Sequence, residues 1–205
     1  MKNKKIGSIL CLSLGILLLV VAAVFLILTV TTTENTRQKA AQILEKVEGY
    51  LPQIVDRVPE ERGNNQMSAI EVDGLNVTAI LEFPQHQRRL AVLSGWDAQK
   101  VGAIPCRFTG SIYDDSLIIG SSDARGQLDF ANRLEVGQKL SLTDMEGNRY
   151  TYAVTAIQHT DHATLEKLQS GDQDLTIFLK DSQTGKYLLI RCETAFGTGN
   201  PSSAK

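Results

Sequence analysis

The stretch DLTIFLKDSQTGKYLLIRC, residues 174–192, puts two candidate nucleophiles in one short segment. Two apolar runs, LTIFL and YLLI, flank a polar turn that contains Gly185, a pattern that predicts a β-hairpin. Lys180 ends the first run and Cys192 follows the second. A lysine amine becomes a covalent nucleophile only when burial or a nearby cation activates it, and a cysteine needs a basic neighbour that stabilises its thiolate. The hairpin therefore raises the question of whether either residue does chemistry.

The chain has three cysteines, and two of them fall in its C-terminal two thirds. Cys11 lies in an apolar N-terminal run, where we expect it to be inert. Cys106 and Cys192 could form a disulfide if this part of the chain is exported. They could equally be two buried thiols, because free cysteine packs as a small hydrophobe. Both alternatives stay open at the level of sequence.

The histidines and the only tryptophan are weaker candidates for a site. His159 and His162 flank Asp161 in QHTDHATLE, but this spacing in a loop lacks the helical geometry that makes histidine pairs convincing metal ligands. His86 is isolated in a polar turn. We therefore predict solvated loop histidines, no metal and no cofactor. Trp96 is expected in the core or at the rim of the domain.

The N-terminus predicts the cellular compartment. Residues 1–5, MKNKK, are basic, and residues 6–30 contain no charge. A bilayer core needs about 20 apolar residues in a helix, whereas a cleavable signal has an apolar region of about 7–15. We therefore predict an uncleaved transmembrane anchor over 6–30, with a long cleaved signal as the alternative. The lysines favour a cytoplasmic N-terminus, which places the rest of the chain outside the membrane.

Residues 31–68 are predicted to form a juxtamembrane helical stalk and linker. Apolar residues recur at helical spacing through TRQKAAQILEKVEGYLPQIVDRV. Pro52 should interrupt or kink the helix, because proline lacks the N–H that a helix needs. We expect this stalk to be a spacer that packs weakly on the following domain.

Residues 69–196 carry the pattern of an all-β domain. Short runs of β-formers alternate with turn signals, which predicts a barrel or sandwich with a few short helices, over 129–134 and 163–169. The polar tail, 197–205, is predicted to be disordered. With a formal net charge of −2 the chain has no basic field for nucleic acid.

Four segments in order resemble the sortases, membrane-anchored cysteine transpeptidases of Gram-positive bacteria. GLNVTAILEFPQHQRRLAVLS resembles the first strands of that family, and IPCRFTGSIYDDSLIIG the run before its histidine. LEVGQKLSLTDMEGNRYTYAVTAI and DLTIFLKDSQTGKYLLIRC resemble the later strands. The likeness, closest to class B-like sortases of clostridia, implies an all-β, closed β-barrel of about eight strands with short helices, preceded by one N-terminal transmembrane helix.

The resemblance also implies three catalytic positions, and this chain has other residues at all of them. A sortase uses a Cys thiolate against the Thr–Gly bond of a motif such as LPxTG, a His for proton transfer and an Arg for the oxyanion. The Cys position falls on Lys180 and the Arg position on Tyr187. The His position falls on Ser122, or on Ser121 after a one-residue slip. We therefore interpret Lys180 as a missing nucleophile, and expect Ser121, Ser122, Lys180 and Tyr187 to line a peptide groove.

Two residues of the last strand are weak rescue candidates for catalysis. Cys192 is a surviving thiol, but a sortase needs a further strand after its cysteine to supply the arginine. Arg191 lies four residues beyond the Arg position, on the same strand face but about 13 Å further along. That distance is too long for the same site.

These residues support three hypotheses. In the first, the protein is a single-pass membrane protein with a catalytically inactive, extracytoplasmic sortase-like domain. That domain would bind a sorting-signal peptide, a pilin or surface protein, or a catalytic sortase. In the second it is an active, divergent sortase that uses Cys192. In the third it is a structural cell-envelope protein without a peptide site. The first is favoured, because a decaying gene would be expected to damage frame and site alike.

Overall fold

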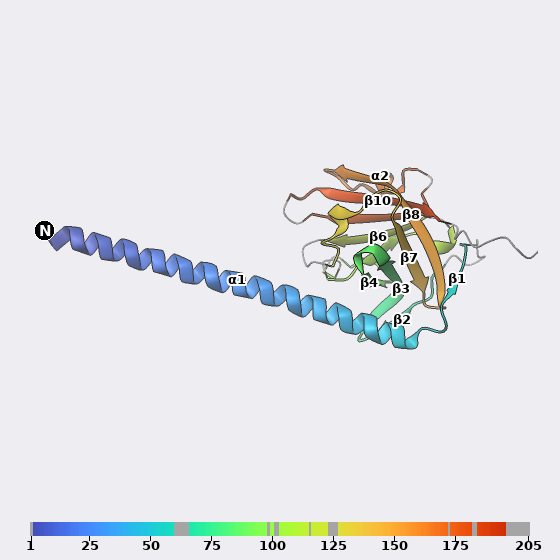
Figure 1. Ribbon diagram of the computed structural model, residues 1–205, viewed down its shortest axis with the longest axis horizontal. Coiled ribbons are helices and arrows are strands. Elements are labelled where there is room, and N and C mark those ends of the chain that lie inside the picture. Colours follow the sequence, from blue (N-terminus) through green and yellow to red (C-terminus); the bar gives the residue numbers. More distant parts are fainter. Residues whose placement is uncertain are drawn as a thin grey trace, which may run out of the picture.

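One long helix and a closed β-barrel make up the protein (Figure 1). The chain is seen in a computed structural model, and the ranges that it describes are 2–59, 66–97, 99–100, 103–114, 116–122, 127–171, 173–181 and 184–195. The predicted disordered tail, 197–205, and most of the predicted linker lie outside these ranges.

Eight strands close the barrel: β3 (Leu75–Phe83), β4 (Arg88–Leu93), β5 (Cys106–Thr109), β6 (Leu117–Ser122), β7 (Lys139–Asp144), β8 (Asn148–Thr160), β9 (Leu175–Lys180) and β10 (Tyr187–Thr194). The order around the ring is β8–β10–β9–β6–β5–β4–β3–β7, and β7 pairs back onto β8. Two short strands extend the ring, β1 (Val55–Asp56) beside β8 and β2 (Ile70–Val72) beside β3. This arrangement confirms the predicted closed barrel of about eight strands.

Alternation along the strands explains why the barrel closes around one apolar interior. Successive side chains of a strand point to opposite faces, so alternate residues of every strand enter the core. Phe83, Ile119, Leu142, Tyr152 and Ile177 are examples, each no more than 1% exposed. Four short helices connect the strands: η1 (Pro84–His86), η2 (Ile112–Asp114), η3 (Ala131–Arg133) and α2 (Leu165–Gln169). The last two lie within the segments predicted to be helical.

A buried carboxylate fixes the turn between β7 and β8. Asp144 is 1% exposed and accepts hydrogen bonds from the backbone N–H groups of Glu146 and Asn148, both at 2.9 Å. The Tyr113 hydroxyl donates to the same side chain at 3.0 Å. Because several donors meet this carboxylate, the desolvation of a buried charge is offset.

The helix α1 (Lys2–Tyr50) packs on the barrel with its last turns. Val47 is fully buried and Ile43 is 7% exposed, in a cluster with residues of β2, β3 and β4. The expectation that the stalk packs weakly is therefore corrected, because an apolar stripe of the helix covers the outside of these strands. The helix ends just before Pro52, whose ring is incompatible with a continuing helix.

The N-terminal part of α1 extends away from the barrel (Figure 1). The side chains of residues 15–26 are exposed around the whole helix, with Leu19 at 71% and Phe25 at 70%. Within the residues that the structure describes, no helix combines the length and the apolar character needed to cross a bilayer. Much of the predicted anchor, 6–30, has side chains outside the described set, so the anchor stays a prediction.

Candidate functional site

The three positions that the resemblance assigns to sortase chemistry lie side by side on three adjacent strands. Ser122 of β6 is the register partner of Lys180 in β9, and Lys180 is also the partner of Tyr187 in β10. Neighbouring strands lie about 5 Å apart, so the three backbones form one short row. The residues that the resemblance assigns to the three positions therefore lie together, with Ser122 rather than Ser121 as the partner of Lys180. The Ser122 side chain lies outside the described part of the structure.

This row is the end of a larger surface on the outside of the barrel, here called the outer face. Two further rows lie behind it along the same three strands. The outer face comprises Ser122, Lys180 and Tyr187, then Gly120, Phe178 and Leu189, then Ile118, Thr176 and Arg191. Within each strand these residues are two apart, so their side chains point to the same side.

The alternate residues of the same strands form the inner face, which belongs to the barrel core. It comprises Leu117, Ile119 and Ser121 of β6, Leu175, Ile177 and Leu179 of β9, and Leu188, Ile190 and Cys192 of β10. Ser121 is only 2% exposed, and its hydroxyl has no hydrogen-bond partner among the described residues. The expectation that Ser121 lines a peptide groove is corrected, because one residue along a strand reverses the face.

Cys192 also lies on the inner face, and it is fully buried. Burial raises the pKa of its thiol far above the usual range, so the thiolate needed for nucleophilic attack is disfavoured. Cys106 is fully buried in the other cluster, beneath α1, and both thiols are free. The sequence left open a disulfide or two buried thiols, and the structure shows two buried free thiols.

Arg191 closes the far end of the outer face. Its guanidinium donates to the Leu168 carbonyl at 2.6 Å, to the Lys167 carbonyl, and to the Thr176 hydroxyl at 3.0 Å. These bonds hold the C-terminal end of α2 on the sheet, where Leu168 is 1% exposed. Burial lowers the pKa of the guanidinium, and no ion pair among the described residues includes Arg191. It therefore acts as a structural clamp, at the far end of the face from Lys180.

An aromatic cluster covers the middle row. Trp96 stacks on Phe178 with ring centroids 5.6 Å apart, and Phe108 packs edge-on against Trp96 at 5.2 Å. Gly120 lies beneath, and a Cβ there would come within 2.3 Å of the indole. The sequence placed Trp96 in the core or at a rim but missed this contact, because a loop tryptophan carries no signal for the strand that it covers.

The remaining row is open to solvent. Lys180 is exposed, Tyr187 is half-buried, and no ion pair in the described part of the chain includes Lys180. The neighbouring Asp181 carboxylate is turned into the loop, where it accepts from the Thr184 hydroxyl at 2.7 Å. Lys186 pairs with Asp161 at 3.3 Å. Lys180 is thus an exposed cation at the open end of the outer face, without an ion pair among the described residues.

The prediction of loop histidines is wrong for His159, which lies in a strand next to this row: Tyr187 pairs with Thr160 of β8, the residue after His159. His159 is exposed near the end of β8, where it is the register partner of Leu188, and His162 is exposed in the loop that follows. No group of three metal-ligating side chains occurs among the residues that the structure describes.

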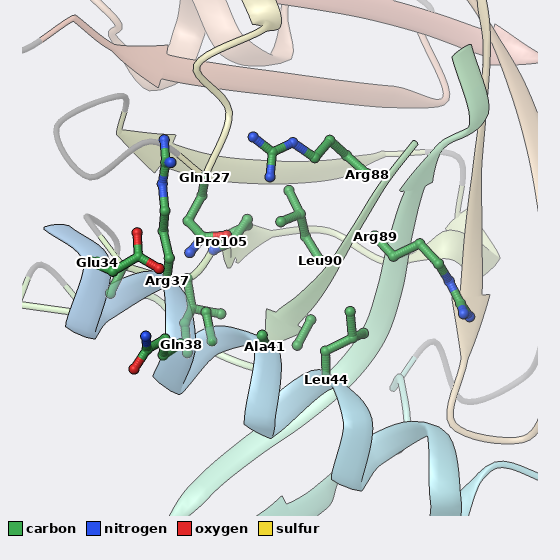
Figure 2. Close-up of a pocket in the computed structure, with 14 residues that line it drawn as sticks. Glu34, Arg37, Gln38, Ala41, Leu44, Arg88, Arg89, Leu90, Pro105 and Gln127 are labelled. Atoms are coloured by element: carbon green, nitrogen blue, oxygen red, sulfur yellow. The ribbon is translucent and has the colours of Figure 1, made fainter. Parts of the chain in front are cut away.

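A pocket of about 260 Å³ lies at the seam between α1 and the barrel (Figure 2). Its floor is apolar, and Arg37 and Arg88 both pair with Asp129, at 3.1 and 3.2 Å. Arg89 points away from Arg88 (Figure 2). It pairs with Glu48 at 2.8 Å. The three arginines around this pocket are thus paired within the chain, whereas no ion pair within the described ranges includes Lys180.

Comparison with known proteins identifies the fold. No protein-family model and no curated protein sequence matches the chain. Several solved structures do match. Sortase C-3 from Streptococcus pneumoniae matches with 18% identity and a TM-score of 0.53, over 80% of this chain and 84% of that one. Sortase C from Clostridium perfringens matches with 15% identity and a TM-score of 0.51, over 82% and 90%. Sortase A from Corynebacterium diphtheriae matches with the same identity and TM-score, over 84% and 87%. The chain has the sortase fold, and the class B-like subtype stays a prediction.

Proposed function

We propose that this protein is a membrane-anchored, extracytoplasmic sortase-fold protein that binds a sorting-signal peptide, or the surface protein or sortase that presents one, without catalysing transpeptidation. The observation that carries the proposal is the open row of the outer face. Strand register brings Ser122, Lys180 and Tyr187 together, the residues at the positions where the resemblance implies His, Cys and Arg.

The residues of the row suit binding rather than transpeptidation. Thiolate attack needs a cysteine, proton transfer near neutral pH needs a group such as histidine, and the oxyanion needs a strong donor. Lys180 is exposed to solvent and lacks the burial that activates a lysine nucleophile. It can still donate hydrogen bonds to a carboxylate or carbonyl, and the Tyr187 hydroxyl can donate or accept.

The position of Cys192 argues against an active, divergent enzyme. Its thiol lies in the barrel core, on the face opposite to Lys180 and Tyr187. A peptide on the outer face would be separated from this thiol by the β-sheet itself, and burial keeps the thiol protonated.

Membrane attachment is supported by the exposed apolar part of α1. Residues 16–26 include nine large apolar side chains that are about half or more exposed. A helix that is apolar all round needs an apolar environment, and a bilayer supplies one next to the basic residues 1–5. We propose that this segment anchors the barrel outside the membrane.

A structural envelope protein without a peptide site is the second candidate, and the aromatic cluster favours it. Trp96 covers Gly120 and Phe178, so the middle row of the outer face is filled by the chain itself. Lys180 and Tyr187 leave their own row open, which favours the binding function over this second one.

The test uses the full chain in detergent micelles with a pool of sorting-motif peptides and triglycine as the accepting amine. We expect saturable binding, with no cleaved peptide and no covalent adduct by mass spectrometry. Lys180→Ala should weaken binding and leave the thermal unfolding curve unchanged, because an exposed side chain contributes little to stability.

A positive control comes from the same barrel. The triple variant Ser122→His, Lys180→Cys, Tyr187→Arg puts the three catalytic residue types back on the open row, and gain of turnover would show that the assay can detect activity. Turnover by the unmodified chain would contradict the proposal, and absence of binding would favour the structural candidate.

A further inference from the structure

The three rows of the outer face differ in how far other parts of the chain cover them. The far row is covered by α2, which Arg191 holds in place. The middle row is covered by Trp96 and Phe108. The near row, with Lys180 and Tyr187, is uncovered. A ligand of this face therefore meets two features together, the near row and the exposed side of Trp96.

Trp96 offers an apolar surface that is held in position. Its side is packed against Phe108 and Phe178, and the indole rests on the backbone of Gly120. Even so, 41% of the residue is exposed, which is unusual for the largest apolar side chain. A partly exposed indole held by neighbours is a stacking surface for an apolar side chain.

Lys180 supplies a cation on the same strand face as Phe178, the residue on which Trp96 stacks. Phe178, on which Trp96 stacks, and Lys180 are two residues apart in β9, so they project to the same side about 6.6 Å apart along the strand. Two acids of the neighbouring loops have partners of their own, Asp181 with Thr184 and Asp161 with Lys186, and no ion pair among the residues that the structure describes includes Lys180. A carboxylate on the ligand is the group that pairs best with the ammonium group of Lys180.

An extended peptide has the same two-residue repeat as the strand beneath it. We infer that the outer face selects an extended peptide in which an apolar side chain, on Trp96, lies two positions from a carboxylate, on Lys180. This inference rests on the proposed peptide-binding function and narrows it to an acidic class of ligand. The carboxylate is either that of an Asp or Glu side chain or that of a chain end.

The experiment exploits the single tryptophan of the chain, since peptides without tryptophan leave Trp96 as the only reporter. The full chain in zwitterionic micelles is titrated with acetyl-Ala-Leu-Ala-Glu-Ala-amide and with the matching glutamine peptide. A third probe, acetyl-Ala-Leu-Ala with a free terminal carboxylate, separates the two sources of the charge. A fourth, acetyl-Ala-Ala-Leu-Glu-Ala-amide, shortens the spacing to one residue.

We expect the Glu peptide to bind about threefold to fivefold more tightly than the Gln peptide, the size of one solvent-exposed ion pair, with a blue shift of the Trp96 emission. The Leu-Glu neighbour peptide should bind as weakly as the Gln peptide, because adjacent side chains of an extended chain point to opposite sides. Tight binding of the third probe would assign the site to a chain end.

The variants separate the charge from the stacking surface. Lys180→Gln should abolish the preference for Glu over Gln, whereas Trp96→Leu should weaken both peptides to the same degree. Lys186→Gln removes another exposed lysine of the same loop region and should change neither affinity. Gly120→Ala, whose new Cβ displaces the indole, should shift the emission of the free protein to the red and weaken both peptides.

Equal affinity for the Glu and Gln peptides, or a preference that survives Lys180→Gln, would overturn this inference. If sorting-motif peptides still bound in that case, the proposed function would stand and only the acidic selectivity would fall. If neither the sorting-motif peptides nor the four probe peptides bound, the proposed function itself would fail.

Discussion

The two faces of β6, β9 and β10 use alternate residues of the same strands for different purposes. Of the nine residues of the inner face, Ser121 alone is polar, and the other eight belong to the barrel core. The outer face passes from the clamped Arg191, through the covered Phe178, to the exposed Lys180. Because neighbouring residues point in opposite directions, the frame can be retained while the chemistry on its outside is replaced.

The strongest contrast between the faces is expected in thiol reactivity. Burial raises the pKa of Cys192, so the thiol stays protonated at neutral pH and reacts only when the barrel opens. With an ordinary folding stability, alkylation by iodoacetamide should be slower than in the unfolded chain by roughly 1000-fold or more. Raising the pH from 7 to 9 should speed both reactions by a similar factor, because native labelling passes through an opened thiol with an ordinary pKa, so the ratio of the two rates should persist.

Peptide mapping after timed quenching measures the rate at Cys192 separately from those at Cys11 and Cys106. Lys180→Cys provides an outer-face thiol in the same barrel as a reference that should label fast. If native Cys192 were labelled as fast as that reference thiol, the predicted difference in thiol reactivity between the two faces would be wrong. The active-enzyme hypothesis would then be favoured again.

The next largest difference is expected in stability. Ile177 is fully buried on the inner face of β9, and Ile177→Ala should reduce the free energy of unfolding by about 3 kcal/mol, through lost burial and the cavity left behind. Chemical denaturation measures the change. Lys180→Ala, three residues further on and facing outwards, is the matched control and should change stability by less than about 0.5 kcal/mol. Comparable losses in the two variants would mean that Lys180 is a packing residue.

Arg191 tests whether the closed end of the outer face is held by one side chain. Arg191→Met keeps an unbranched side chain but removes the donors to the Lys167 and Leu168 carbonyls, so we expect a loss of about 1.5 kcal/mol. Hydrogen exchange should accelerate in α2 and much less in β9. Arg133→Met, at an exposed position in η3, is the control. Unchanged exchange in α2 would show that Leu168 packing alone holds this helix.

Much of the frame could be predicted from the sequence, because it depends on local patterns. Alternating β-formers and turn residues predicted a barrel or sandwich, the resemblance to sortases favoured the barrel, and Pro52 predicted the interruption of the helix. The pairing of Lys180 with Tyr187 is consistent with the hairpin predicted for residues 174–192, because the turn between two strands fixes their register.

The contacts that close the outer face could not be predicted, because each joins segments that are distant in sequence. Arg191 binds backbone carbonyls of Lys167 and Leu168, and a carbonyl is common to every residue type. Trp96 reaches β9 across 82 residues, the separation between 96 and 178. The apolar stripe of the stalk was visible in the sequence, but the strands that Ile43 and Val47 cover were not.

The smallest effect concerns the polar exception on the inner face. The Ser121 hydroxyl is buried without a partner among the described residues, so it lost its bonds to water on folding and gained none in return. Ser121→Ala should therefore raise the free energy of unfolding by about 1 kcal/mol, and Ser121→Thr, which keeps the hydroxyl, should not. Denaturation midpoints at constant slope measure both. Destabilisation by Ser121→Ala would mean that the hydroxyl forms a hydrogen bond in solution. The inner face would then contain one polar contact within its apolar packing.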